Sequence, residues 1–257
     1  MLYNFFKKIL HIIIYSSSLT YGYSTTQNTQ HYYTFTYIIN HPSLGPVDGT
    51  SIFTVLVLKE KISAINLATG DKVSIKDLPY IHILLEAIKK ESNIDTVLYD
   101  KNNFPKKITS NVSPHILEAG FSIDILNHKT VANNYTLESQ KLRIAYFQQN
   151  YQKWLALKKN TYSIAYQDKA FEDIYIDGLK VGVKNNKIST LEDIFSIKQV
   201  NLSEKEKVKT INQLFKFIKR RINKKNKLTL LYDIQYGYPY YIKNKADKIE
   251  IFLHNLN

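Results

Sequence analysis

The chain contains no cysteine among its 257 residues. Disulfide bridges, thiolate nucleophiles and cysteine-ligated metals are therefore excluded, and so is a lipid attached to an N-terminal cysteine. A chain without disulfides must be held together by its hydrophobic core alone. The hydrophobic share of 44% can supply such a core, and the length suits one large domain or two of ordinary size.

Long apolar runs are also missing. The apolar stretch near the N-terminus, residues 9–14, is far shorter than the roughly 20 residues of a membrane-spanning helix. Lys7 and Lys8 precede this stretch, and three serines follow it at 16–18. This order of charged, apolar and small polar residues is typical of a secretory signal peptide. No acidic residue occurs before Asp48, which suits translocation.

We therefore expect a signal peptide over residues 1–23, cleaved between Ser18 and Thr25, and an exported mature chain that is periplasmic or secreted. No transmembrane span is expected in the mature chain. The alternative is an amphipathic first helix that packs on the body of the protein. The absence of cysteine fits an exported bacterial protein better than a eukaryotic extracellular one.

Recognised catalytic and metal-binding patterns are absent as well. The seven histidines form no H-x-H or H-E-x-x-H pair, which argues against a metal site. The sequence has no G-x-S-x-G nucleophile motif, no phosphate-binding loop and no G-x-G-x-x-G motif. We therefore predict no catalytic residue, no metal and no cofactor. A hydrolase remains an alternative, with a site assembled from residues that are distant in sequence.

An internal repeat organises the chain. Alternating residues at 33–37 and again at 162–166 predict a strand in each half. The pattern V-x-V-x-x-x-K-I follows at 55–62 and at 181–188. It is typical of a strand, a polar turn and the start of a return strand. Matching patterns in the same order indicate a duplication.

A helix is expected next in each half. Apolar residues at i, i+3, i+4 and i+7 form one stripe that must pack on a sheet. The two stripes are Ile81, Leu84, Leu85 and Ile88, and Ile211, Leu214, Phe215 and Ile218. Ser203 and Glu206 have the spacing of a capping box, which predicts the start of the second helix.

Both halves then contain a Tyr-Asp pair, a Pro-x-x-Ile segment and a last alternating strand. These segments are Tyr99-Asp100, 105–108 and 121–125 in the first half, and Tyr232-Asp233, 239–242 and 249–253 in the second. We expect Asp100 and Asp233 to accept backbone hydrogen bonds in turns, with Pro105 and Pro239 as further structural residues.

The sequence thus predicts an α+β protein of two tandem divergent repeats, each a small antiparallel sheet with a helix packed on one face. The first repeat covers residues 24–127 and the second covers 137–257, with a polar linker at 128–136. A long helix at 136–159 should open the second repeat and pack across its sheet. Its apolar face is formed by Ile144, Phe147, Tyr151 and Trp154.

Several of these segments carry a family resemblance. They are Trp154, the strand at 162–166, Val181 and Val183, Leu214, Phe215 and Ile218, and above all the segment Tyr-Asp-Ile-Gln-Tyr-Gly-Tyr-Pro at 232–239. Through them the second half, about residues 140–253, resembles an uncharacterised bacterial family, domain of unknown function 6174. The first half keeps only the outline. The resemblance implies an exported α+β domain and no particular reaction.

The segment Tyr236-Gly237-Tyr238-Pro239 is the most distinctive short motif. Gly237 can adopt positive φ, and Pro239 fixes the exit from the turn. One interpretation is a structural turn whose tyrosines pack on the edge of the sheet. The alternative is an aromatic ligand-binding surface, formed by Tyr236, Tyr238, Tyr240 and Tyr241.

Positive charge is concentrated in the second half. The formal net charge is +13, and residues 205–248 hold thirteen basic and three acidic residues, a net of +10. The densest basic segment, 219–227, begins in the last turn of the predicted helix, where cations complement the helix dipole. It is either a solvated helix end or a patch for polyanions. The basic side chains are Lys219, Arg220, Arg221, Lys224, Lys225 and Lys227.

From the sequence alone we expect an exported, non-catalytic binding or interaction protein. Its ligand is unknown, and its partner would be a protein or a component of the cell envelope. The first alternative is a binder of polyanions or anionic membrane surfaces that uses residues 219–227, with nucleic acid disfavoured by export. The second alternative is the hydrolase named above.

Overall fold

The computed structural model describes residues 32–40, 50–59, 61–90, 96–110, 120–169, 178–194, 200, 207–222, 228–244 and 246–257. The signal peptide expected over residues 1–23 lies outside this part of the chain, and so do Ser203 and Glu206. Among the described residues, no helix is both long enough and apolar enough to cross a membrane.

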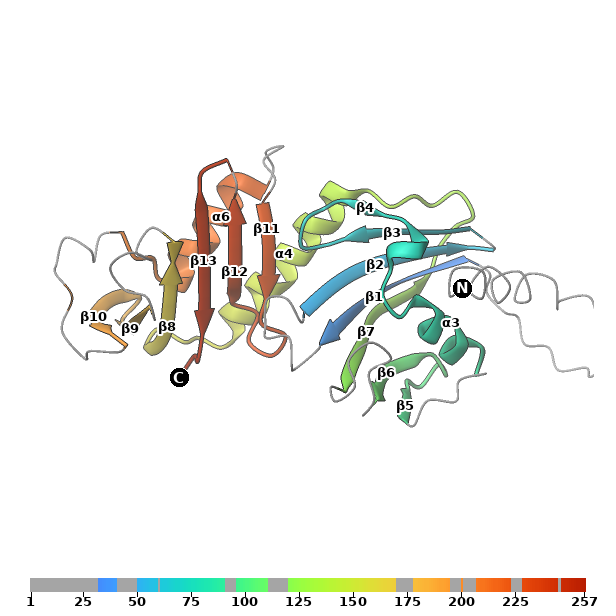
Figure 1. Ribbon diagram of the computed structural model, residues 1–257, viewed down its shortest axis with the longest axis horizontal. Coiled ribbons are helices and arrows are strands. Elements are labelled where there is room, and N and C mark those ends of the chain that lie inside the picture. The colour runs from blue at the N-terminus through green and yellow to red at the C-terminus, as the bar shows by residue number, and fades with distance from the viewer. Residues whose placement is uncertain are drawn as a thin grey trace, which may run out of the picture. The chain divides into compact units, whose positions relative to one another are not determined.

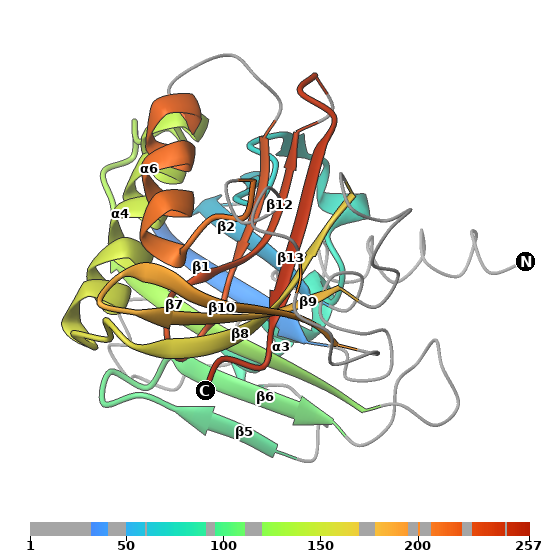
Figure 2. The same ribbon diagram turned by 90° about the vertical axis from the view of Figure 1, so that its left-hand side faces the viewer.

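The first sheet is antiparallel and has seven strands in the order β4-β3-β2-β1-β7-β6-β5 (Figure 1). Its strands are β1 (Tyr32–Asn40), β2 (Thr50–Leu58), β3 (Lys61–Asn66), β4 (Lys72–Val73), β5 (Thr96–Tyr99), β6 (Pro105–Ser110) and β7 (Phe121–Thr130). Figure 2 shows β7, β6 and β5 side by side at one edge. β7 continues past the predicted end at Ile125, so the strand takes in the first residues of the expected linker.

The second sheet is also antiparallel, with six strands in the order β10-β9-β8-β13-β12-β11 (Figure 1). Its strands are β8 (Tyr162–Asp168), β9 (Leu179–Lys184), β10 (Lys187–Asp193), β11 (Leu228–Tyr232), β12 (Pro239–Asn244) and β13 (Ile249–His254). If β4 is set aside, both sheets have the same strand order, and in both a helix joins the third strand to the fourth.

The two V-x-V-x-x-x-K-I segments form hairpins with one register. In the first, Val57 pairs with Ile62 and Leu58 with Lys61. In the second, Val183 pairs with Ile188 and Lys184 with Lys187. Residues with positive φ close both turns, Lys59 in the first and both Asn185 and Asn186 in the second. The sequence pattern therefore specified strand, turn and register together, since a side-chain period of two fixes which residues face the core.

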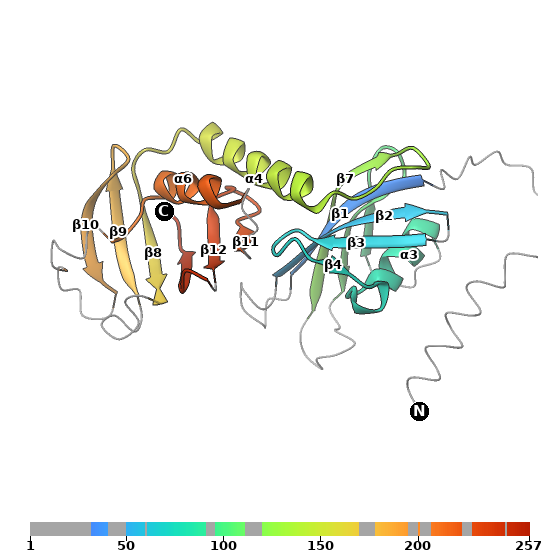
Figure 3. The same ribbon diagram turned by 90° about the horizontal axis from the view of Figure 1, so that it is seen from above.

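Three α-helices complete the fold among the described residues, together with a short 3-10 helix, η3 (Ile75–Asp77). The α-helices are α3 (Ile81–Lys89), α4 (Ser139–Ala156) and α6 (Ile211–Ile222). The apolar stripe of α6 is buried, as its spacing predicts. Figure 3 shows α4 and α6 beside each other on the same side of the second sheet.

The predicted cap of α6 was wrong. The helix begins at Ile211, not near Ser203, and Thr210 and Gln213 cap it. The Thr210 backbone N–H donates to Gln213 Oε1 (2.8 Å), and the Gln213 backbone N–H donates to Thr210 Oγ1 (3.3 Å). This reciprocal pair satisfies two backbone donors that the first turn leaves open. Thr210 and Gln213 have the same i, i+3 spacing and lie directly before and within the first turn of α6.

The long helix α4 lies within the predicted segment, but its buried face differs from the predicted one. Phe147 and Trp154 are buried, while Ile144 and Tyr151 are only partly so. The rest of the buried face is polar: Arg143 and Asn150. A prediction from hydrophobicity alone therefore finds Phe147 and Trp154 but not the buried polar residues Arg143 and Asn150.

The first sheet is buried on both faces of its central strands. Six consecutive residues are buried in β1 (34–39) and in β2 (52–57). One face packs with α3 around Phe35, Tyr37 and Val55. The opposite face contributes residues to the same core cluster as the second sheet, α4 and α6; these are Ile38, Ile52, Ile65 and Leu67. The alternation at 33–37 predicted a strand but not this second buried face.

Candidate functional site

A cavity of about 430 Å³ lies between α4 and the face of the first sheet opposite α3. β1 and β2 contribute alternate residues of that face to the lining: Thr34, Thr36 and Ile38 from β1, and Ile52 and Thr54 from β2. β7 contributes the consecutive residues 126–129, around an irregularity in its pairing with β1 that puts Leu126 opposite Thr36 and Lys129 opposite Thr34. A volume of this size is within the range of small-molecule sites.

The sheet side of the cavity combines apolar side chains with hydroxyl groups that are already bonded. Thr36 faces Thr54 across β1 and β2, and their Oγ1 atoms are 2.9 Å apart. The Thr34 hydroxyl donates to the Val55 carbonyl oxygen (2.7 Å). Because these hydroxyls already take part in hydrogen bonds, a ligand need not offer them polar partners.

One face of α4 forms the other wall, and its lining residues recur three or four positions apart, as the helical period requires. The lining residues are Leu142, Ala145, Tyr146, Gln149, Asn150 and Lys153. The Asn150 side chain donates from Nδ2 to the Tyr146 carbonyl oxygen (2.8 Å), which fixes the amide against the helix. Tyr232, the last residue of β11, completes the wall and packs edge-on against the Tyr146 ring, with centroids 5.1 Å apart.

The Tyr232 hydroxyl is buried and has no hydrogen-bond partner among the described residues. Burial raises the pKa of this hydroxyl well above its ordinary value, so it stays protonated. The adjacent Arg143 guanidinium donates to the Leu228 and Ala68 carbonyl oxygens and so ties β11 to the end of β3, while its Nε is also unpartnered. Burial lowers the pKa of Arg143, and electrostatic interactions with Tyr232 and with Asp71 act in the opposite direction.

Two buried tyrosines offer a direct test of these hydrogen-bond assignments. The Tyr162 hydroxyl accepts the Ile211 backbone N–H (2.9 Å) at the start of α6, whereas the Tyr232 hydroxyl has no described partner. Removing an acceptor from a buried donor costs about 1–3 kcal/mol. Tyr162→Phe should therefore lower the free energy of unfolding by that amount, and Tyr232→Phe should leave it unchanged or raise it. Urea titrations of both variants would measure this, and equal losses would contradict the assignment.

The mouth of the cavity carries positive charge. Lys129 and Lys153 line it, and no aspartate or glutamate does so among the described residues. Lys129 Nζ lies 5.7 Å from the centroid of the Tyr135 ring. Lys153 Nζ donates to the Ile234 carbonyl oxygen (3.0 Å). The His128 ring stacks on Phe104, which belongs to the core cluster on the α3 side of the sheet. Burial lowers the pKa of His128, and the Asp100 charge offsets part of that effect.

The Tyr-Gly-Tyr-Pro segment forms a tight turn between β11 and β12. The Tyr236 backbone N–H donates to Asp233 Oδ1 (2.6 Å), and the Asp233 N–H donates to the Tyr238 carbonyl oxygen (2.9 Å). Gly237 adopts φ +77° and lies against α4. Pro239 is the first residue of β12. The aspartate thus has a structural function in this turn.

The four tyrosines of the proposed aromatic surface do not share an exposed face. Tyr238, Tyr240 and Tyr241 are 5%, 8% and 8% exposed, and Tyr236 is half-buried. Tyr238 packs against Trp154, and the Tyr241 hydroxyl donates to Glu250 Oε1 (2.7 Å). Burial raises the pKa of Tyr240 to about 12. Their ligand-binding role stays a prediction, and three of the rings have little surface to offer.

The corresponding turn of the first sheet has similar geometry. Asp100 Oδ1 accepts the backbone N–H groups of Asn102 (2.8 Å) and Phe104 (2.9 Å), and the Asp100 N–H donates to the Phe104 carbonyl oxygen. Asn103 adopts φ +64°, as Gly237 does in the second sheet. Pro105 opens β6 just as Pro239 opens β12.

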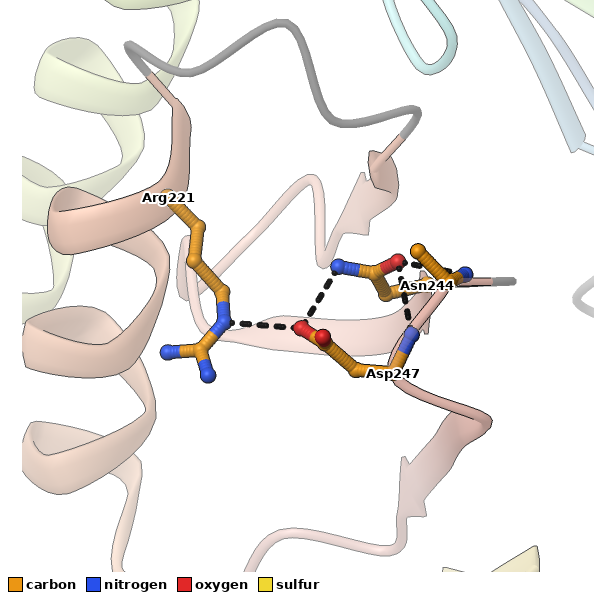
Figure 4. Close-up of polar contacts among 4 residues, drawn as sticks. Arg221, Asn244 and Asp247 are labelled. Atoms are coloured by element: carbon orange, nitrogen blue, oxygen red, sulfur yellow. Dashed lines mark hydrogen bonds and ion pairs between the residues drawn. The ribbon is translucent and has the colours of Figure 1, made fainter.

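Only part of the basic segment falls on described residues: Lys219, Arg220 and Arg221 end α6, while Lys224, Lys225 and Lys227 lie outside. Arg221 is engaged in the structure. Its Nε lies 3.1 Å from Asp247 Oδ2 (Figure 4). Its guanidinium covers the Phe217 ring. Asn244 Nδ2 donates to the same carboxylate oxygen (2.9 Å). Arg221 therefore holds the β12–β13 turn against α6, while Lys219 and Arg220 are exposed.

Sequence reasoning missed the residues that build the cavity. The signals were weak: threonines at 34, 36 and 54 inside strands that are otherwise apolar, and Asn150 within the predicted long helix. Within the described part of the chain, no group of three histidine, aspartate or glutamate residues could hold a metal ion.

Comparison with known proteins adds one relationship. No curated protein and no solved structure matches the chain. The resemblance predicted for the second half is confirmed, because residues 146–250, from the middle of α4 to β13, match the model of a family of unknown function, DUF6174.

Proposed function

We propose that this chain is an exported, non-catalytic binding protein whose ligand occupies the cavity between α4 and the first sheet. The observation that carries the proposal is the cavity itself, which has a volume of about 430 Å³ and a mostly apolar lining surface. Sites of this kind are usually apolar, with a few polar groups that fix orientation. Here those groups are Tyr232, Asn150 and the mouth lysines.

Binding is better supported than hydrolysis. A hydrolytic site needs a nucleophile within hydrogen-bond reach of a base. The threonine hydroxyls on the cavity wall bond to each other or to backbone oxygen, and no carboxylate lines the cavity among the described residues. The titratable imidazole, His128, stacks on Phe104.

Binding is also better supported than a polyanion patch. Arg221 is neutralised by Asp247. A second hollow, of about 340 Å³, contains Lys207, Lys209 and Lys248, but Asp168 and Asp247 line it as well. Because these aspartates lie beside the lysines, they weaken the attraction of the hollow for a polyanion.

We further propose that the chain arose by tandem duplication, with repeats at 24–127 and 137–257. The shared strand order, the matched hairpin registers and the paired Asp100 and Asp233 turns support this. Relatives whose two halves align no better than unrelated α+β domains would contradict it.

The proposal that the protein is exported rests on the sequence of residues 1–23. The partner of the exported protein would be another protein or a component of the cell envelope. N-terminal sequencing of the mature chain would test the cleavage.

Filling the cavity should abolish binding without unfolding the protein. Ala145 lines the cavity and is exposed at its mouth, so Ala145→Trp should block entry with a small effect on stability. The neutral dye N-phenyl-1-naphthylamine, which fluoresces in apolar sites, provides the readout. We expect the wild type to bind the dye and Ala145→Trp to bind at least tenfold more weakly, about 1.4 kcal/mol.

Ala156→Trp is the matched control. Ala156 is exposed on the same helix, at its last residue, and does not line the cavity. This variant should bind the dye as the wild type does. Equal dye binding by Ala145→Trp and the wild type, or no dye binding by the wild type, would contradict the proposed function.

A further inference from the structure

We infer that the cavity holds a single-chain amphiphile with an anionic head, the chain lying along the wall and the head at the lysines of the mouth. The inference rests on the proposed function and names its ligand class. Single-chain anions of this kind include free fatty acids and phosphorylated single-chain lipids.

The wall supports an apolar chain. The apolar surface that a chain can reach comes mainly from lining residues that are only partly buried, Leu126, Leu142 and Tyr146. Ile38, Ile52 and Leu67 from the first sheet, at 4%, 1% and 5% exposure, are apolar lining residues with little accessible surface of their own. The hydroxyls of Thr34, Thr36 and Thr54 are satisfied within the protein, so an alkyl chain can cover them without breaking a hydrogen bond. Apolar contact is non-directional, so the binding free energy depends more on the length of the alkyl chain than on its chemical detail.

The mouth supports a negative head. Its charged side chains are Lys129, from β7, and Lys153, from α4, on opposite walls. Neither ammonium group contacts a carboxylate among the described residues: Lys129 lies over a tyrosine ring, and Lys153 bonds one carbonyl oxygen. An ammonium group has three donors, so each retains donors for a ligand.

The nearby aspartates do not cancel this charge by direct pairing. Asp233 adjoins Tyr232 and Ile234, but its carboxylate accepts the Tyr236 backbone N–H. Asp100 acts on His128 at a distance, and its carboxylate accepts two backbone N–H groups of its own turn. A charged head is costly to bury, so the head remains at the mouth and the chain enters.

Ligands that share one chain but differ in the head provide the test. Decanoate, monodecyl phosphate, decanol and decyltrimethylammonium would compete with N-phenyl-1-naphthylamine on the full chain, below the concentrations at which they aggregate. We expect both anions to displace the dye at lower concentration than decanol, and the cation to be weakest. Added salt should weaken the anions alone. The tighter anion would indicate whether the natural head is a carboxylate or a phosphate.

Charge-removing variants localise the head. In Lys129→Gln/Lys153→Gln, the affinity for decanoate should fall about three- to tenfold, in line with two partly exposed ion pairs, while decanol is unaffected. Lys106→Gln/Lys216→Gln removes the same charge from exposed positions that do not line the cavity, and should leave both affinities unchanged.

Different results would contradict the proposed ligand class and the proposed binding function. If the dye binds and Ala145→Trp blocks it, but the anions compete no better than the cation, or the mouth variant retains its decanoate affinity, then the ligand class is wrong and the binding function stands. If Ala145→Trp leaves dye binding intact, the cavity itself is not the site, and both proposals are overturned.

Discussion

Replacing Trp154 with alanine should lower the free energy of unfolding by about 3–5 kcal/mol, the usual cost of removing a large aromatic side chain from a core. The indole is 2% exposed. It packs edge-on against Tyr162, with ring centroids 5.5 Å apart, and against Tyr238 at 6.5 Å. It also connects α4 to α6, since its Nε1–H donates to Asn212 Oδ1 (2.8 Å). Urea or thermal denaturation would measure the loss.

Two further variants serve as controls for Trp154→Ala. Leu155→Ala changes the next residue, which is 44% exposed, and should cost much less. Trp154→Phe keeps an aromatic ring but leaves the Asn212 oxygen without its indole donor, so an intermediate loss is expected. If Trp154→Ala lost no more than Leu155→Ala, the indole would not be in the core position described.

Gly237→Ala should destabilise the protein by about 2–4 kcal/mol, because two costs combine. The residue adopts φ +77°, a conformation that side chains with a β-carbon resist. A β-carbon there would also lie 2.5 Å from the Asn150 carbonyl oxygen and 2.7 Å from Lys153 Cβ, so α4 would have to shift. Chemical denaturation would again provide the measurement.

Asparagine at position 237 would separate the cost of the positive φ from the cost of the close approach to α4. Asparagine tolerates left-handed backbone better than alanine does, so Gly237→Asn should regain most of the stability if φ alone matters. We expect Gly237→Asn to be nearly as unstable as Gly237→Ala, because its β-carbon meets the same helix. In the equivalent turn of the first sheet, the exposed Asn103 already has φ +64° with a β-carbon in place, so Asn103→Ala should cost only about 1–2 kcal/mol. Full recovery in Gly237→Asn would rule out the close approach.

The same two turns show how far a short motif can be trusted. The order Tyr-Asp, turn, Pro-x-x-Ile predicted a turn between two strands, and the aspartates accept the backbone hydrogen bonds that such turns require. The motif could not say whether its tyrosines face solvent. Trp154, on a helix far away in sequence, covers Tyr238. Exposure of an aromatic ring depends on which element packs over it.

The helix α4 shows the complementary limit. Its length and approximate position followed from the sequence, but its buried face includes Arg143 and Asn150. Arg143 is buried because the carbonyl oxygens of Ala68 and Leu228 receive its guanidinium. One oxygen lies in β11 and the other in the turn after β3, so no local pattern could have marked the arginine as interior.

Local sequence patterns were enough to predict the α+β class, the alternating strands, both hairpins and the buried stripe of α6, whereas in α3 only Ile81 and Leu84 of the predicted stripe are buried. These features depend on neighbours within a few residues, whose spacing sets which side chains share a face. Which faces meet depended on packing between elements that are distant in sequence. That packing buried the central strands of the first sheet on both sides and left an open cavity between this sheet and α4. A cavity forms where elements distant in sequence fail to fill the space between them, and its lining therefore leaves little periodic signal in the chain.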